Sequence, residues 1–240
     1  MDVAFLYETL LTLVPGIPLT LKLAFSSVTF GALVALPIAL LRISKQPLLR
    51  APAHVYVFFF RSTPLLVQIF LIYYGLGQFP SVRASVLWPI LREPYWCAVI
   101  ALTLNTAAYT SEIIRGGLQS VPTGEIEAAR ATGMSQLLIL RRITLPQALQ
   151  QAVPAYGNEI ILMVKATALA SIITLMEVTG LAAKLISETY RAVEVFLVAG
   201  VIYLVINFAV TRVIQLVEYF AIPHGRPILQ APVLEKGGTA

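Results

Sequence analysis

The stretch EAARATGMSQLLILRRITLP, residues 127–146, is a polar island of about twenty residues between two long apolar segments. Its residue types predict two short helices joined by a turn. Either Ser120 or Thr123 is expected to accept a hydrogen bond from a free amide at the start of the first helix. Pro122 suits a first-turn position, because no N–H partner is required there. The stretch therefore predicts a helical loop exposed to the cytosol.

The first predicted helix has charges and small residues that suit an exposed contact surface. Glu125 and Glu127 fall in its first turns, where the positive end of the helix dipole favours carboxylates. Ala128 and Ala129 favour helix and leave a low surface that another backbone can approach.

The turn and the second predicted helix follow from five residues. Gly133 suits the left-handed residue that closes a helix, and Ser135 is expected to cap the next one. Arg141 and Arg142 are expected to end that helix near its negative pole. Pro146 is expected to limit its continuation.

The spacing of this loop resembles the EAA loop of the transmembrane subunits of ATP-binding-cassette (ABC) importers. The residues that match are Glu127, Ala128, Ala129, Gly133, Ile143, Leu145 and Pro146. The resemblance implies that they form a coupling helix, which docks into a groove on a cytoplasmic ATPase.

The resemblance extends to nearly the whole chain and narrows to the polar amino acid permeases, including those for histidine, arginine and opines. The matching segments are FRSTPLLVQ (60–68), LNTAAY (104–109), EIIRGG (112–117) and KAT (165–167). Ser62 departs from the Gly that is usual there, and we interpret it as a tolerated small residue. The implied partners are ATPase subunits, a second permease subunit (a copy or a paralogue) and an extracytoplasmic solute-binding protein.

Composition places the chain in a membrane. Of its residues 58% are hydrophobic and 12% charged, and the mean hydropathy is +0.82, values far from those of soluble domains. A length of 240 residues predicts one membrane domain, 1–222, and a cytoplasmic tail, 223–240. We expect no cofactor or metal, since there is no phosphate-binding loop, one cysteine and only two distant histidines, His54 and His224.

The fold class expected is an all-α membrane protein of about five transmembrane helices. A helix needs about 20 apolar residues to cross the hydrocarbon layer. The candidates are 17–41, 54–76, 95–114, 155–175 and 193–217. The N-terminus has acidic residues in place of a basic cluster, so the first span is not expected to be a cleaved signal.

The basic residues predict the orientation. Segments 42–61 and 115–150 hold four Lys or Arg each and segment 212–236 holds three. The alternate segments, the N-terminus to residue 22, 79–94 and 177–192, hold one, two and two. Because the basic side is normally cytoplasmic, the N-terminus is predicted outside, and the loop (about 120–146) and the C-terminus inside.

Polar residues within the spans are the candidate substrate contacts. A carboxylate in a span costs about 2.5–3.5 kcal/mol on insertion scales, so Glu159 needs a partner or a role. Lys165 is six residues away and on another face of the helix, so simple pairing is not expected. Either Glu159 pairs with a cation of another span or stays hydrated, or it binds the cationic end of a substrate. Gln68 and Asn105 either bond helices together or contact substrate.

Two flanking arginines are open to two interpretations. Arg61 and Arg115 either extend to the interface or brace the coupling loop, with Glu112 as a partner for Arg115.

The function expected is the permease subunit of an ABC importer in a bacterial inner (cytoplasmic) membrane. Its cargo would be a polar, basic amino acid (arginine, histidine, lysine or ornithine) or an opine derived from one. The chain itself would not be an enzyme, because ATP hydrolysis belongs to the partner. The alternatives are an importer of neutral or acidic amino acids, and an ion-coupled secondary carrier. An intramembrane enzyme would need a nucleophile with a base, or metal ligands, and the spans offer neither.

Overall fold

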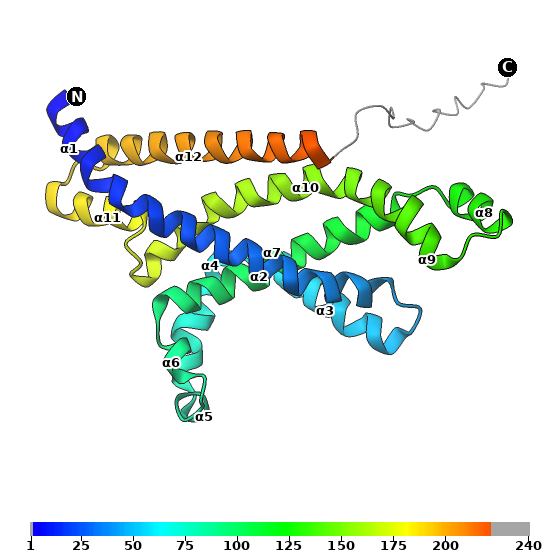
Figure 1. Cartoon of the computed structure of the whole chain (residues 1–240). Helices are drawn as coiled ribbons and strands as arrows, with labels where there is room; N and C mark the ends of the chain where they lie inside the picture. Colours follow the sequence, from blue (N-terminus) through cyan, green and yellow to red (C-terminus); the bar gives the residue numbers. More distant parts are fainter. Residues whose placement is uncertain (1, 222–240) are drawn as a thin grey trace, which may run out of the picture.

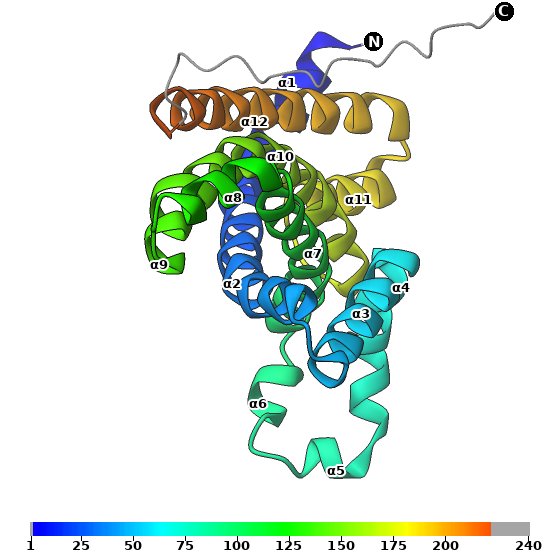
Figure 2. The ribbon, with the colours of Figure 1, turned by 90° about the vertical axis from the view of Figure 1, so that its right-hand side faces the viewer.

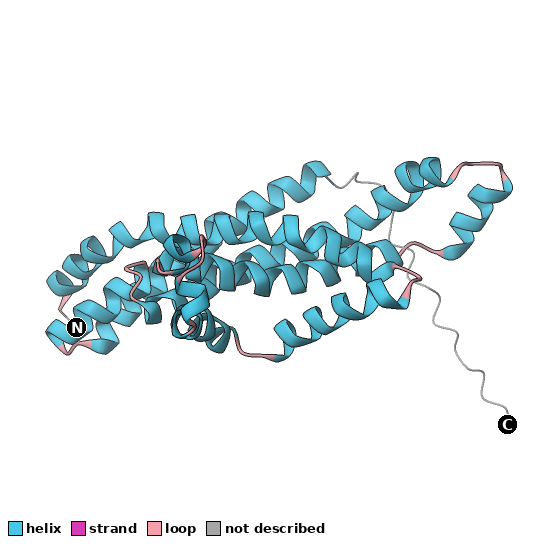
Figure 3. Cartoon of the chain, turned by 90° about the horizontal axis from the view of Figure 1, so that it is seen from below, coloured by secondary structure: helices cyan, strands magenta, loops and turns pink. Residues whose placement is uncertain are grey.

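The computed structural model describes residues 2–221, so the expected tail, 223–240, and His224 lie outside the described residues. In that part the regular structure is helical throughout (Figure 3). The α-helices are α1 (Val3–Leu13), α2 (Ile17–Ile43), α3 (Pro47–Ser62), α4 (Leu65–Phe70), α5 (Pro80–Arg83), α6 (Trp88–Leu91), α7 (Pro94–Gln119), α8 (Thr123–Ala131), α9 (Gln136–Ile139), α10 (Leu145–Ala166), α11 (Val178–Thr189) and α12 (Ala192–Ala221). Short 3-10 or π-helical turns join several of them: Val14–Gly16, Leu71–Gly75, Leu76–Gln78, Leu140–Thr144 and Thr167–Ile173.

The expected spans are present as long apolar helices. Four helical stretches of the described chain are long and apolar enough to cross a membrane, and the bent pair α3–α4 makes a fifth candidate. Helix α2 packs along α7 at close range. A Cβ on Gly31 would lie 2.3 Å from Thr106 Cγ2, so a larger residue would separate these two helices.

The second span is broken, whereas the sequence predicted one segment from 54 to 76. The chain bends by 106° between α3 and the helical stretch Leu65–Gln78, which begins with α4. Thr63 is extended, with φ −106° and ψ 142°. The physical reason is Pro64, whose ring disfavours the helical conformation at the residue before it. A broken helix at membrane depth requires partners for its freed backbone groups.

The ends of the bundle agree with the predicted topology. In Figure 1, α1 lies at one end and the α8–α9 loop at the other, and α12 runs from the first end toward the second. The connection through α5 and α6 forms an arm that projects sideways from the bundle (Figures 1 and 2).

A buried carboxylate fastens α11 to the bundle. Glu177 is fully buried, and its Oε1 accepts the Gly180 N–H at 2.9 Å as the N-cap of α11. Its Oε2 accepts the Tyr203 hydroxyl of α12 at 2.6 Å and the Thr20 hydroxyl of α2 at 3.3 Å. One side chain therefore joins three helices.

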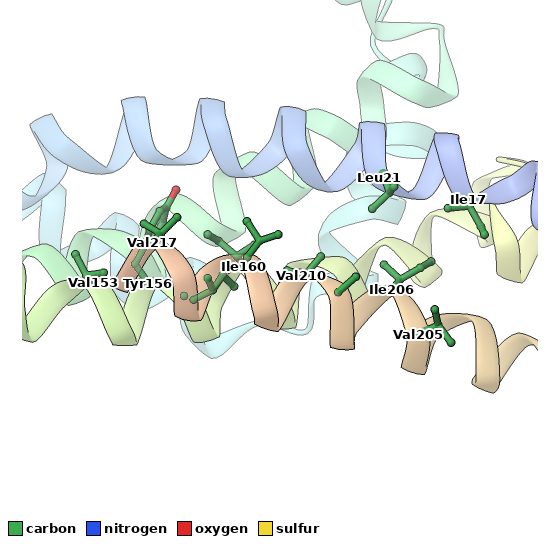
Figure 4. A pocket seen from close by; sticks show the side chains of 13 residues that line it. Ile17, Leu21, Val153, Tyr156, Ile160, Val205, Ile206, Val210 and Val217 are labelled. Carbon is green, nitrogen blue, oxygen red and sulfur yellow. The ribbon is translucent and has the colours of Figure 1, made fainter. Parts of the chain in front are cut away.

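An apolar groove of about 630 Å³ lies between α2, α10 and α12 (Figure 4). Its lining residues, among them Leu21, Ile160 and Val210, are apolar apart from Tyr156. The Tyr156 hydroxyl donates to the Val28 carbonyl at 3.3 Å. The groove thus offers no charged group to a polar solute, and the candidate polar contacts lie elsewhere.

Candidate functional site

The loop between α7 and α10 begins with α8, which spans nine residues. The expected side-chain cap is absent. Pro122 occupies the N-cap position and has no side-chain donor or acceptor, while the Ser120 hydroxyl donates to the Gly117 carbonyl at 2.8 Å. The expectation that Ser120 or Thr123 caps α8 was therefore wrong. Glu125 does lie in the first turn, as expected.

The turn after α8 is the predicted one. Gly133 has φ +81°. Its N–H donates to the Arg130 carbonyl at 2.9 Å, and the Met134 N–H donates to the Ala129 carbonyl at 3.1 Å. This pair of bonds is the Schellman arrangement that ends helices at a left-handed residue. Ser135 caps α9 as predicted, accepting the Leu138 N–H at 3.4 Å.

The second helix does not end at Arg141 and Arg142, and Pro146 does not stop it. Gln136–Ile173 forms one continuous helical span. A π-helical turn, Leu140–Thr144, precedes α10, and the Leu145 N–H bonds to the Leu140 carbonyl five residues back. Pro146 then falls in the first turn of α10, directly after this π-helical turn. The second helix of the loop therefore continues without a break into the transmembrane helix α10.

The loop surface is open to contact with another protein. Glu127, Ala128 and Gly133 are exposed, whereas Ala129 is buried. Leu137 keeps 74% of its surface exposed. Between α8, α9 and the π-helical turn lies a depression of about 430 Å³, lined by Ile126, Arg130, Gln136, Leu137, Ile139, Leu140 and Thr144. Apolar surface of this kind, rimmed by charge, is typical of docking sites.

The remaining loop residues of the predicted coupling set lie where the loop joins α10. Ile143 is half-buried, while Leu145 and Pro146 are exposed. Their contact with an ATPase stays a prediction.

Glu159 is buried among the helices. It is 8% exposed, and its Oε1 accepts the Thr106 hydroxyl of α7 at 2.9 Å. Among residues 2–221 no ion pair involves Glu159, and Lys165 is exposed. The simple Glu159–Lys165 pair is therefore absent, as expected, and so is the alternative pairing with a cation of another span.

Gln68 and Asn105 meet at the break in the second span. Gln68 Nε2 donates to the Phe60 carbonyl at 3.0 Å and to the Thr63 carbonyl at 3.1 Å. Asn105 Nδ2 donates to Gln68 Oε1 at 3.0 Å and to the Phe60 carbonyl at 3.3 Å. These bonds satisfy the backbone groups that the break releases. A substrate contact by either amide stays a prediction.

Glu112 of α7 is the centre of a cluster of arginines. Arg115 Nε and Nη2 donate to its two oxygens at 2.9 and 3.0 Å, which confirms the predicted pair. Arg42 Nη1 also contacts Glu112 Oε1, and Arg61 Nη1 lies 3.7 Å from Oε2. Sequence reasoning missed Arg42, since nothing in the chain signals that the end of α2 meets α7 there.

Comparison with known proteins identifies the family. Residues 27–219 match the model of the "Binding-protein-dependent transport system inner membrane component" family. The octopine transport system permease protein OccM of Rhizobium meliloti is 60% identical over 94% of this chain and 92% of its own. The nopaline transport system permease protein NocM of Agrobacterium fabrum is 56% identical, over 100% and 97%.

More distant relatives and a solved structure agree. The histidine/lysine/arginine/ornithine transport system permease protein HisM of Salmonella typhimurium is 43% identical over 80% of this chain and 83% of its own. A crystal structure described as an amino acid ABC transporter with histidines superposes with a TM-score of 0.81 at 36% identity, covering 92% of this chain and 99% of that one. The chain therefore belongs to the family of binding-protein-dependent transport system inner membrane components, as a multi-pass membrane permease.

Proposed function

We propose that this chain is the permease subunit of an ABC importer that takes up a basic amino acid or an opine derived from one. The observation that carries the proposal is Glu159, a buried carboxylate within a span that has no ion-pair partner among the described residues. A carboxylate kept in that position at a cost of about 2.5–3.5 kcal/mol suits a cationic cargo. Relatives named for octopine, nopaline and histidine/lysine/arginine/ornithine transport support this class.

The partners follow from the family. A cytoplasmic ATPase pair would dock on the α8–α9 loops of two permease subunits, and an extracytoplasmic binding protein would deliver the cargo. The membrane would be the bacterial inner membrane. ATP hydrolysis would belong to the ATPase subunit, and this chain would pass the movement of that subunit to its own transmembrane helices.

The connection of the helices suggests how the loop acts on the polar cluster. Thr106 lies on α7, which enters the loop, and Glu159 lies on α10, which leaves it. Near the loop these helices are in backbone contact, because a Cβ on Gly117 would lie 2.7 Å from the Ala148 carbonyl oxygen. A movement of the loop would therefore shift α7 and α10 together and change the surroundings of Glu159.

The test is purification from the native membrane followed by reconstitution. We expect an ATPase subunit to copurify with the chain. In vesicles with the binding protein, we expect ATP-dependent uptake of arginine or octopine and little uptake of leucine or glutamate. Uptake that survives ATP depletion would refute the importer, and preferred uptake of leucine or glutamate would refute the cargo class.

A further inference from the structure

The cluster around Glu112 contains more positive charge than its carboxylate neutralises. Arg115 binds Glu112 with two donors, and Arg42 contacts the same carboxylate. Arg61 is the third arginine, and it reaches Glu112 only at 3.7 Å, beyond hydrogen-bond distance. Three guanidinium groups therefore face one carboxylate, which leaves an excess of two positive charges.

The backbone of Arg61 packs beside α7, and its side chain is directed along α7 toward Glu112. The carbonyl of its neighbour Phe60 accepts a hydrogen bond from Asn105. Asn105 is the twelfth of the 26 residues in α7. At 1.5 Å per residue, Asn105 is about 17 Å from the start of a helix about 39 Å long. The backbone beside Arg61 thus lies next to the middle of α7. Its side chain is nevertheless 43% exposed, with the guanidinium 5.2 Å from the centre of the Tyr109 ring.

Two of these arginines, Arg42 and Arg61, line a cavity of about 450 Å³. Its lining residues are Arg42, His54, Val57, Phe58, Arg61, Ser62 and Tyr109. Arg42 is 10% exposed, and its Nε is buried without a hydrogen-bond partner among the described residues. Such a donor costs about 1–3 kcal/mol when it stays unsatisfied, more for a charged group. The cavity therefore holds a buried donor and an exposed guanidinium, both suited to an anion.

We propose that this cavity binds a carboxylate of the transported solute, with Arg61 as its main donor and Arg42 as the second. The inference rests on the proposed function and extends it to the other end of the cargo. Asn105 bonds the carbonyl of Phe60, the residue before Arg61, and the next residue of α7, Thr106, bonds Glu159. One solute is therefore able to reach a carboxylate site at Arg61 and a cation site at Glu159. The excess of two charges favours solutes with one or two carboxylates beside a cationic end. A phospholipid phosphate shares the anion chemistry, so the experiment must distinguish the two sources.

The experiment measures equilibrium binding to the purified permease–ATPase complex without the binding protein. The probes are arginine, octopine and agmatine, which is arginine without its carboxylate. We expect Arg61→Gln to lower the ratio of arginine to agmatine affinity at least tenfold, and Arg61→Lys to restore part of it. The matched control is Arg212→Gln, an exposed arginine of α12 that bonds Gln215. An unchanged ratio, or an equal loss for arginine and agmatine, would overturn the carboxylate site.

Repeating the measurement in nanodiscs distinguishes a solute carboxylate from a lipid phosphate as the ligand of the cavity. We expect Arg61→Gln to lower the arginine-to-agmatine affinity ratio equally in phosphatidylcholine alone and with phosphatidylglycerol added. An effect that appears only with phosphatidylglycerol would assign the cavity to a headgroup and overturn the proposal. If the wild-type complex binds and imports none of the three probes, the proposed cargo class fails. That result differs from one in which the wild type binds arginine and Arg61→Gln leaves the affinity ratio unchanged.

Discussion

The Thr106 hydroxyl donates a 2.9 Å hydrogen bond to Glu159 Oε1, and both side chains are buried. The bond links α7 to α10, the two helices that the α8–α9 loop connects. Because neither residue has room to turn toward solvent, the bond orients the carboxylate. It also makes the position of Glu159 depend on the spacing of these helices.

The first prediction tests that bond. Thr106→Val keeps the shape of the side chain and removes the donor, and a hydrogen bond to a charged group is worth about 1.5–3 kcal/mol. We expect the melting temperature of the purified complex to fall by several degrees. The matched control is Thr110→Val on the same helix, because the Thr110 hydroxyl is buried without a partner among the described residues. Equal melting temperatures for the two variants would show that the Thr106 bond stabilises nothing.

The spans, their topology and the turn at Gly133 were predictable from the sequence. Long apolar runs need no tertiary information, because the membrane itself selects helices of that length. A glycine between two helical patterns indicates a left-handed residue, and Gly133 adopts one. The pair Glu112–Arg115 follows from helical spacing alone.

The break at Pro64 and the continuation of the helix through Pro146 were harder to predict from the sequence. Each proline comes within two residues of a helical segment, yet the helix ends before Pro64 and continues through Pro146. The difference depends on tertiary partners: Gln68 and Asn105 satisfy the groups freed at the break, and a π-helical turn adjusts the chain before Pro146. Neither the pairing of Thr106 with Glu159 nor that of Arg42 with Glu112 leaves a local signal, because each joins residues more than fifty positions apart.

The second prediction concerns coupling through the loop. Gly133 has φ +81°, and open space surrounds the position of an added Cβ, so the cost of Gly133→Val is backbone strain of about 1–2 kcal/mol. We expect the variant to insert in the membrane but to bind the ATPase weakly, or to hydrolyse ATP without transport. Gly124→Val adds the same side chain in open space within α8, without a left-handed backbone. Normal transport by Gly133→Val would remove Gly133 from the coupling.

The third prediction uses two adjacent glycines of α7. A Cβ on Gly117 would lie 2.7 Å from the Ala148 carbonyl oxygen of α10, whereas Gly116 has nothing within 4 Å. Gly117→Ala is therefore expected to destabilise the fold by about 1–3 kcal/mol, since backbone cannot move aside easily. Gly116→Ala is expected to be neutral or slightly stabilising, because alanine favours helix. Thermal unfolding of both variants is the measurement, and a similar melting temperature would contradict the close approach.

The fourth prediction is a pH dependence that originates at Glu177, which lies between two spans. Burial raises the pKa of this carboxyl, and the hydrogen bonds from Tyr203, Gly180 and Thr20 oppose the shift. The folded chain therefore keeps the proton where the unfolded chain has lost it. The contribution to stability is complete below the ordinary carboxyl pKa, about 4.3, and is lost as the pH rises through the raised value.

Glu177→Gln removes the titration and keeps an acceptor. Melting temperatures of the wild type and this variant, recorded from about pH 4 to pH 8, are expected to diverge as the wild type loses stability relative to Glu177→Gln. Parallel curves would show that Glu177 titrates alike in both states.

The central claim is that Glu159 receives the cationic end of the cargo, and its most direct test is uptake by Glu159→Gln in the complete reconstituted importer. The variant keeps the shape of the side chain and an acceptor for Thr106, but not the charge. The account predicts that uptake of arginine or octopine falls at least tenfold while ATP hydrolysis still responds to the loaded binding protein. Unchanged uptake of these cationic solutes, with ATP coupling intact, would contradict it.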